Sequence, residues 1–174
     1  MRSFNPAPDI VVFPECSIPI HDLHALRTYA IDTDSVVFAG THTLRQTDGD
    51  RSHYDALDIT RKDRKGWNAL TGMTVLPVFC GHQSLAHVKA VPSVFEHTDL
   101  TVTTRELNTL VPLSLTIRDR TLRVLPVVCA EALQPNAAKS QYDIVVIVAY
   151  NDGISPFLPM IQQNSQGQIP VVFC

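Results

Sequence analysis

Three side chains with complementary chemistry lie near the ends of short apolar segments in this 174-residue sequence. They are the carboxylate of Glu15, the ammonium of Lys89 and the thiol of Cys129. A thiolate can attack an electrophilic carbon, a carboxylate within reach can act as general base and then as acid, and a lysine can stabilise a developing oxyanion. This set suits acyl transfer from an amide or attack on a nitrile carbon.

Each of the three residues also has a more ordinary explanation when it is taken alone. A free cysteine is usually a small buried hydrophobic residue, and a lysine is nearly always a solvent-facing side chain. A carboxylate just after a strand is commonly a polar loop residue. The chemical interpretation therefore depends on whether the fold brings Glu15, Lys89 and Cys129 to one place.

Two segments that end in these residues read as buried strands. Residues 9–14, DIVVFP, form a β-branched run that ends immediately before Glu15. Residues 122–133, LRVLPVVCAEAL, contain an apolar run that ends abruptly at Cys129. A cysteine at such a strand end can present its sulfur at the edge of a sheet, beside backbone N–H groups.

The remaining pattern favours an α/β fold. An amphipathic helix is expected over residues 20–33 and a short helix over 157–166. Further strands are expected over 35–43, 74–80, 143–149 and 169–174, a hairpin over 110–129, and a weakly alternating strand over 52–60. Residues 81–100, which include Lys89, show no regular pattern. The early strand–helix–strand order indicates an α/β arrangement.

Composition excludes several classes of function. The net charge is −3 and no Lys/Arg stripe is present, so nothing indicates a nucleic-acid surface. No apolar run reaches the length of a membrane span. The four cysteines include no Cys-x-x-Cys pair, which favours a reducing, cytoplasmic setting over a disulfide framework. Cys80 and His82 are too few donors to predict a metal site.

Four segments, in this order, resemble the nitrilase, or carbon–nitrogen hydrolase, superfamily. DIVVFPE, residues 9–15, looks like the strand that leads to the family's catalytic glutamate. HVKAVPSVFE, residues 87–96, looks like its catalytic lysine segment with a second glutamate. VLPVVCAE, residues 124–131, and DIVVIVAYND, residues 143–152, look like its nucleophile elbow and the strand and Asn-containing turn that follow.

The resemblance implies a fold and a role for each matched residue. The fold would be a nitrilase-like α-β-β-α sandwich, with residues 1–174 forming a single, partial domain that lacks the family's first strand and helix and its C-terminal portion. Glu15 would be the general base, Lys89 the oxyanion-stabilising cation and Cys129 the nucleophile. The supporting residues would be Glu96 beside Lys89, the backbone N–H of Ala130 in the oxyanion hole, Glu131 and Asn151.

The implied activity is hydrolysis of a non-peptide carbon–nitrogen bond, in an amide rather than a nitrile, through a thioester. No metal or organic cofactor would be needed. The partners would be a small-molecule substrate and either further copies of the chain or a fused domain. Two alternatives stay open: a non-catalytic nitrilase-like sensor or scaffold domain of a larger protein, and a Cys–His thiol hydrolase on another fold that uses one of the seven histidines.

Overall fold

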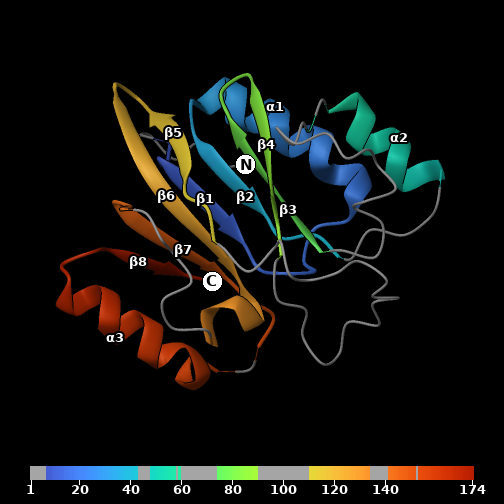
Figure 1. Ribbon diagram of the computed structural model, residues 1–174. Helices are drawn as coiled ribbons and strands as arrows, with labels where there is room; N and C mark the ends of the chain where they lie inside the picture. Colours follow the sequence, from blue (N-terminus) through green and yellow to red (C-terminus); the bar gives the residue numbers. More distant parts are fainter. Residues whose placement is uncertain are drawn as a thin grey trace.

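The computed structural model describes residues 7–42, 48–57, 59, 74–89, 110–133, 141–151 and 153–174 (Figure 1). Within these residues, one four-stranded sheet contains strands β1 to β4 in sequence order. Strands β1 and β2 are parallel, and the pairs β2–β3 and β3–β4 are antiparallel. The strands span β1 Ile10–Phe13, β2 Val36–Ala39, β3 Val75–Cys80 and β4 Gln83–Val88.

A second four-stranded sheet contains β5 to β8, again in sequence order. Strands β5 and β6 form the antiparallel hairpin that the sequence predicts, and β6, β7 and β8 are parallel. Parallel pairing explains the nearly continuous apolar runs of β6 and β7, because both faces of these strands are covered. The strands span β5 Leu113–Ile117, β6 Arg120–Val128, β7 Ile144–Val148 and β8 Val171–Phe173.

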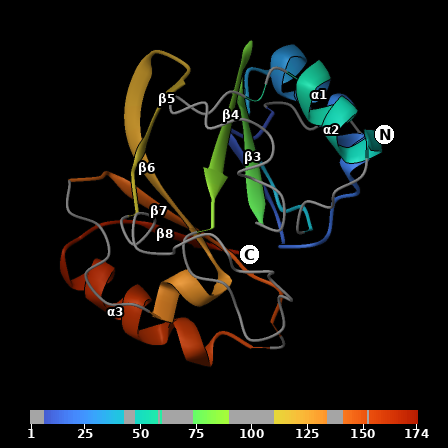
Figure 2. The same ribbon diagram turned by 45° about the vertical axis from the view of Figure 1, so that its right-hand side comes forward.

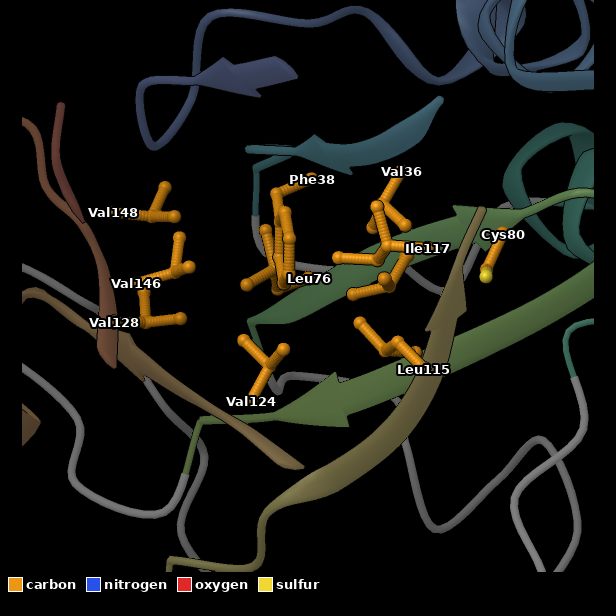
Figure 3. Close-up of a cluster of buried hydrophobic side chains, with 11 residues drawn as sticks. Val36, Phe38, Leu76, Cys80, Leu115, Ile117, Val124, Val128, Val146 and Val148 are labelled. Atoms are coloured by element: carbon orange, nitrogen blue, oxygen red, sulfur yellow. The ribbon is translucent and has the colours of Figure 1, made fainter. Parts of the chain in front are cut away.

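The two sheets pack face to face through a core of branched aliphatic side chains (Figure 3). Alternation along each strand selects this face: Val36 and Phe38 of β2 point into the core, whereas Val37 points to the opposite side. The buried residues of the inter-sheet core are Val36, Phe38, Leu76, Val78, Cys80, Leu115, Ile117, Val124, Val128, Val146 and Val148.

Helices cover the outer face of each sheet, which gives an α-β-β-α order of layers (Figure 2). Helices α1 and α2 lie outside the first sheet, and α3 lies outside the second. The α/β class predicted from the sequence is therefore confirmed. The helical segments are η1 Ile20–Asp22, α1 Leu23–Thr33, α2 Asp48–Ala56, η4 Cys129–Leu133, η5 Ser155–Phe157 and α3 Leu158–Gln166.

Two local predictions are wrong. The sequence predicts a strand over residues 52–60, but residues 52–56 belong to helix α2. Tyr54 in this helix and Leu57 just after it are both buried, three positions apart, which is a helical rather than a strand spacing. The irregular region predicted after Cys80 instead contains strand β4, and this strand leads directly to Lys89. Glu96, expected to support Lys89, lies outside the described residues.

Candidate active site

Glu15 reaches the site because the chain turns tightly after β1. Strand β1 pairs with β2 up to Phe13 and Ala39, and the residue that follows β2 is Gly40. A Cβ on Gly40 would lie 1.9 Å from the carbonyl oxygen of Pro14 and 2.7 Å from the amide nitrogen of Glu15. Only a residue without a side chain lets these backbones approach so closely. Glu15 is buried at this position, with 5% of the residue exposed.

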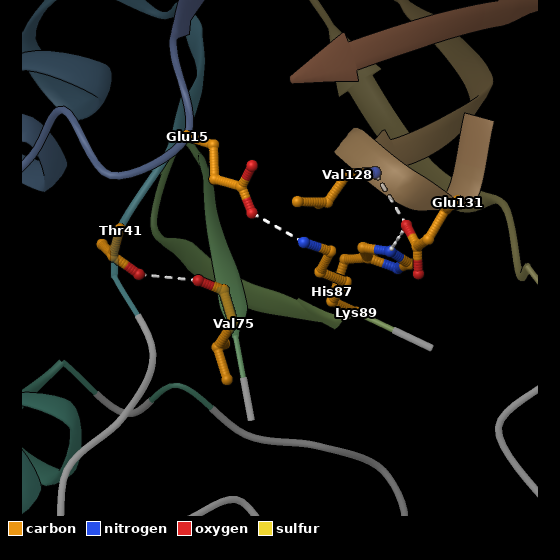
Figure 4. Close-up of polar contacts among 7 residues, drawn as sticks. All are labelled: Glu15, Thr41, Val75, His87, Lys89, Val128 and Glu131. Carbon is orange, nitrogen blue, oxygen red and sulfur yellow. Dashed lines mark hydrogen bonds and ion pairs between the residues drawn. The ribbon is translucent and has the colours of Figure 1, made fainter. Parts of the chain in front are cut away.

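Lys89 follows β4 and forms a buried ion pair with Glu15. Its Nζ donates a hydrogen bond to Oε1 of Glu15 over 2.8 Å, and the residue is 4% exposed (Figure 4). Its backbone N–H donates to the carbonyl of Thr74 over 2.9 Å, which continues the β3–β4 pairing. An unpaired buried charge is costly, and in this pair the two opposite charges compensate each other.

Cys129 occupies a turn that redirects its side chain. Strand alternation places Val124 and Val128 toward the first sheet, so a regular continuation would point residue 129 toward α3. Instead, Cys129 has φ +46°, in the left-handed region that non-glycine residues seldom adopt. Its side chain packs against both the inter-sheet core and the α3 side of the sheet. In this conformation the thiol is near enough to Glu15 for the carboxylate to raise the pKa of Cys129.

The surroundings of Cys129 favour the protonated thiol. Burial raises the pKa of Cys129 above its ordinary value of 9.0, and the negative charge and hydrogen bond of Glu15 raise it further. The charge of Lys89 and the N–H of Ala130 act in the opposite direction. The sulfur therefore holds its proton at rest, with the Glu15 carboxylate placed to accept it.

Glu131 is buried directly behind this turn. It is 1% exposed, and its Oε2 accepts a hydrogen bond of 2.7 Å from the backbone N–H of Val128. The same oxygen lies 2.8 Å from Nε2 of His87, which is also buried (Figure 4). Glu131 thus stabilises the backbone turn at Cys129 through this hydrogen bond to Val128.

The structure brings together four of the seven residues singled out from the sequence: Glu15, Lys89 and Cys129, with the Ala130 N–H on the sulfur. Glu131 supports the turn. Asn151 lies on an exposed turn, where its Oδ1 accepts a hydrogen bond of 3.3 Å from the Gly153 N–H, so its described role is local.

Sequence reasoning missed His87. It lies two residues before Lys89. Because side chains alternate along an extended chain, His87 and Lys89 point to the same face of the first sheet. Predicting β4 as a strand would have placed His87 on the same face as Lys89. No local pattern could have shown that His87 contacts Glu131.

Within the described ranges, no cluster of three or more His, Cys, Asp or Glu side chains is placed to hold a metal ion. The helices described above include none with the length and apolar character needed to cross a membrane. Comparison with protein-family models, curated proteins and solved structures finds no match to this chain. Its function is therefore inferred from the motifs and from the geometry of the site.

Proposed function

We propose that this chain is a thiol-dependent carbon–nitrogen hydrolase of the nitrilase type, which cleaves a non-peptide amide through a thioester on Cys129. The observation that carries the proposal is the buried Glu15–Lys89 pair, 2.8 Å between Oε1 and Nζ, which is near enough to Cys129 for both charges to act on the pKa of its thiol. These residues are separated by 74 and 40 positions along the chain, yet the fold brings them into one neighbourhood.

In the proposed reaction, Glu15 takes the proton of Cys129 as the sulfur attacks the amide carbon. A carbon–sulfur bond forms, and the oxyanion is stabilised by Lys89 and by the backbone N–H of Ala130. The carbon–nitrogen bond then breaks, and Glu15 returns the proton to the departing ammonia or amine. A water molecule that Glu15 deprotonates hydrolyses the thioester, releasing a carboxylic acid and restoring the thiol.

The test measures both turnover and the covalent intermediate. A panel of linear carboxamides, N-carbamoyl compounds and nitriles is incubated with the protein, ammonia release is followed, and the intact mass is recorded during turnover. We expect release of ammonia and an acyl adduct that maps to Cys129. Cys129→Ala should abolish both with an unchanged far-UV circular dichroism spectrum. Cys174→Ala is the matched control, since that half-buried thiol only donates to the carbonyl of Val12.

A non-catalytic sensor or scaffold is the second candidate function. The raised pKa of Cys129 favours it, because a thiol that holds its proton at rest is less nucleophilic than a preformed thiolate. This candidate predicts no ammonia release and no acyl adduct on any member of the panel. Full turnover by Cys129→Ala would reject the thioester mechanism itself.

A further inference from the structure

The buried pair of His87 and Glu131 links the two halves of the site. His87 belongs to β4 in the first sheet, which leads to Lys89, whereas Glu131 belongs to η4 at the end of β6 in the second sheet. Their 2.8 Å contact is therefore a polar bridge between the strand end that carries Lys89 and the turn that carries Cys129 (Figure 4).

The contact between His87 and Glu131 stabilises the unusual backbone conformation of Cys129, which has a positive φ. A non-glycine residue in the left-handed region is strained and persists only where its surroundings fix it. Oε2 of Glu131 accepts the N–H of Val128, the residue just before the turn at Cys129. The hydrogen bond from Val128 to Glu131 thereby spans Cys129 and fixes the turn. This hydrogen bond persists only while the buried carboxylate keeps its orientation.

His87 supplies what holds that carboxylate. An ionised carboxylate can only accept hydrogen bonds, so the Nε2 of His87 must donate to it. A buried carboxylate that loses a donor pays a desolvation cost and is free to change rotamer. The side chain of His87 thus helps to fix the orientation of Glu131, and its Nε2 contacts that carboxylate and not the sulfur.

We propose that His87 is a positioning residue, which acts through Glu131 to hold the turn at Cys129 so that the sulfur faces Glu15 and Lys89. This inference rests on the proposed hydrolase function for its catalytic consequence. Its structural consequence, the placement of the sulfur beside Glu15, is measurable without any substrate.

The first measurement is the pH dependence of Cys129 alkylation by iodoacetamide, resolved by peptide mapping because Cys16 is exposed. The variants are His87→Phe, which keeps a ring without a donor, and His87→Gln, which keeps a donor. His82→Phe is the matched control, an exposed histidine on the same hairpin. We expect the alkylation midpoint of Cys129 to fall toward 9.0 in His87→Phe, since a displaced sulfur escapes the burial and charge that raise it.

The second measurement is steady-state turnover with an amide that the wild type accepts. We expect kcat of His87→Phe to fall about 10²-fold, the loss typical of a 1 Å misplacement, with little change in KM. His87→Gln should recover most of both readouts, and His82→Phe should match the wild type. A purely structural role would lower the melting temperature without moving the alkylation midpoint.

The outcomes separate the two proposals. An unchanged alkylation midpoint in a folded His87→Phe variant overturns the positioning role even if the protein is a hydrolase. A shifted midpoint in a protein that turns over no amide leaves the positioning role standing and rejects the hydrolase. If His87→Phe does not fold, Glu131→Met replaces it, because the thioether keeps the length of the side chain but lacks the carboxylate oxygen that accepts the Val128 N–H and contacts His87; a wild-type midpoint in that variant would also overturn the proposal.

Discussion

Substituting Gly40 by alanine tests whether the close approach after β1 places Glu15. The new Cβ would lie 1.9 Å from the Pro14 carbonyl oxygen and 2.4 Å from its carbon, whereas real Cβ contacts are essentially never shorter than 3.0 Å. The two backbones must therefore separate by roughly 1 Å, a displacement that costs about 10²-fold in rate when it affects a catalytic group. Overpacking of this kind also destabilises by about 1–3 kcal/mol.

The assay for Gly40→Ala combines turnover, thermal melting and alkylation of Cys129. We expect kcat to fall by about 10²-fold and the melting temperature to fall by several degrees. The alkylation midpoint of Cys129 should also decrease, because Glu15 moves away from the sulfur. Gly49→Ala is the control, since beyond its chain neighbours and its own helix backbone no described atom lies within 4 Å of the added Cβ. Wild-type turnover in a Gly40→Ala protein that melts at a lower temperature would refute the assignment of Glu15 as general base.

Three further predictions concern single side chains. Glu15→Gln should accelerate alkylation of Cys129 at pH 8, because the charge and hydrogen bond that raise its pKa are removed, while turnover falls by about 10² or more; slower alkylation would contradict this electrostatic account. Lys89→Met should lower the free energy of unfolding in urea by about 3 kcal/mol, because a buried carboxylate loses its cation. The control Asp9→Asn, which breaks a half-exposed surface ion pair, should cost less than about 1 kcal/mol. Asn151→Ala should change kcat less than twofold, an expectation of about 0.4 kcal/mol or less in activation free energy, and a larger loss would restore the supporting role that the sequence suggested.

The parts of the fold that could be predicted from the sequence are those with a strong local signal. The β-branched runs became β1, whose residues are partly buried, and β7, which is almost fully buried, and their ends locate Glu15 and the Asn151 turn. The abrupt end of the apolar run in β6 likewise located the turn at Cys129. In each case the signal lies within a few consecutive residues.

The parts that could not be predicted depend on partners far away in the sequence. In β4, buried Ser84 and His87 interrupt the apolar pattern, and the polar partner of His87 lies 44 positions away. A polar residue in a strand normally indicates an exposed face, so the buried polar residues of β4 obscured the pattern that would have predicted a strand. Helix α2 carries few apolar residues, and Tyr54 alone does not distinguish helical from strand spacing.

The protonation state of Cys129 is the property that the sequence alone predicts least well, and it changes how the proposed reaction would proceed. A cysteine near a lysine suggests a thiolate, but burial and the Glu15 carboxylate outweigh the Lys89 charge and raise the pKa of Cys129. Lys89 is already committed to Glu15 at 2.8 Å, so much of its charge is balanced before it acts on the sulfur. In the proposed reaction the thiolate therefore forms only when Glu15 takes the proton, which couples nucleophile formation to the attack itself. Since oxidation of cysteine follows thiolate character, the same arrangement would protect Cys129 at rest while leaving it reactive toward a bound amide.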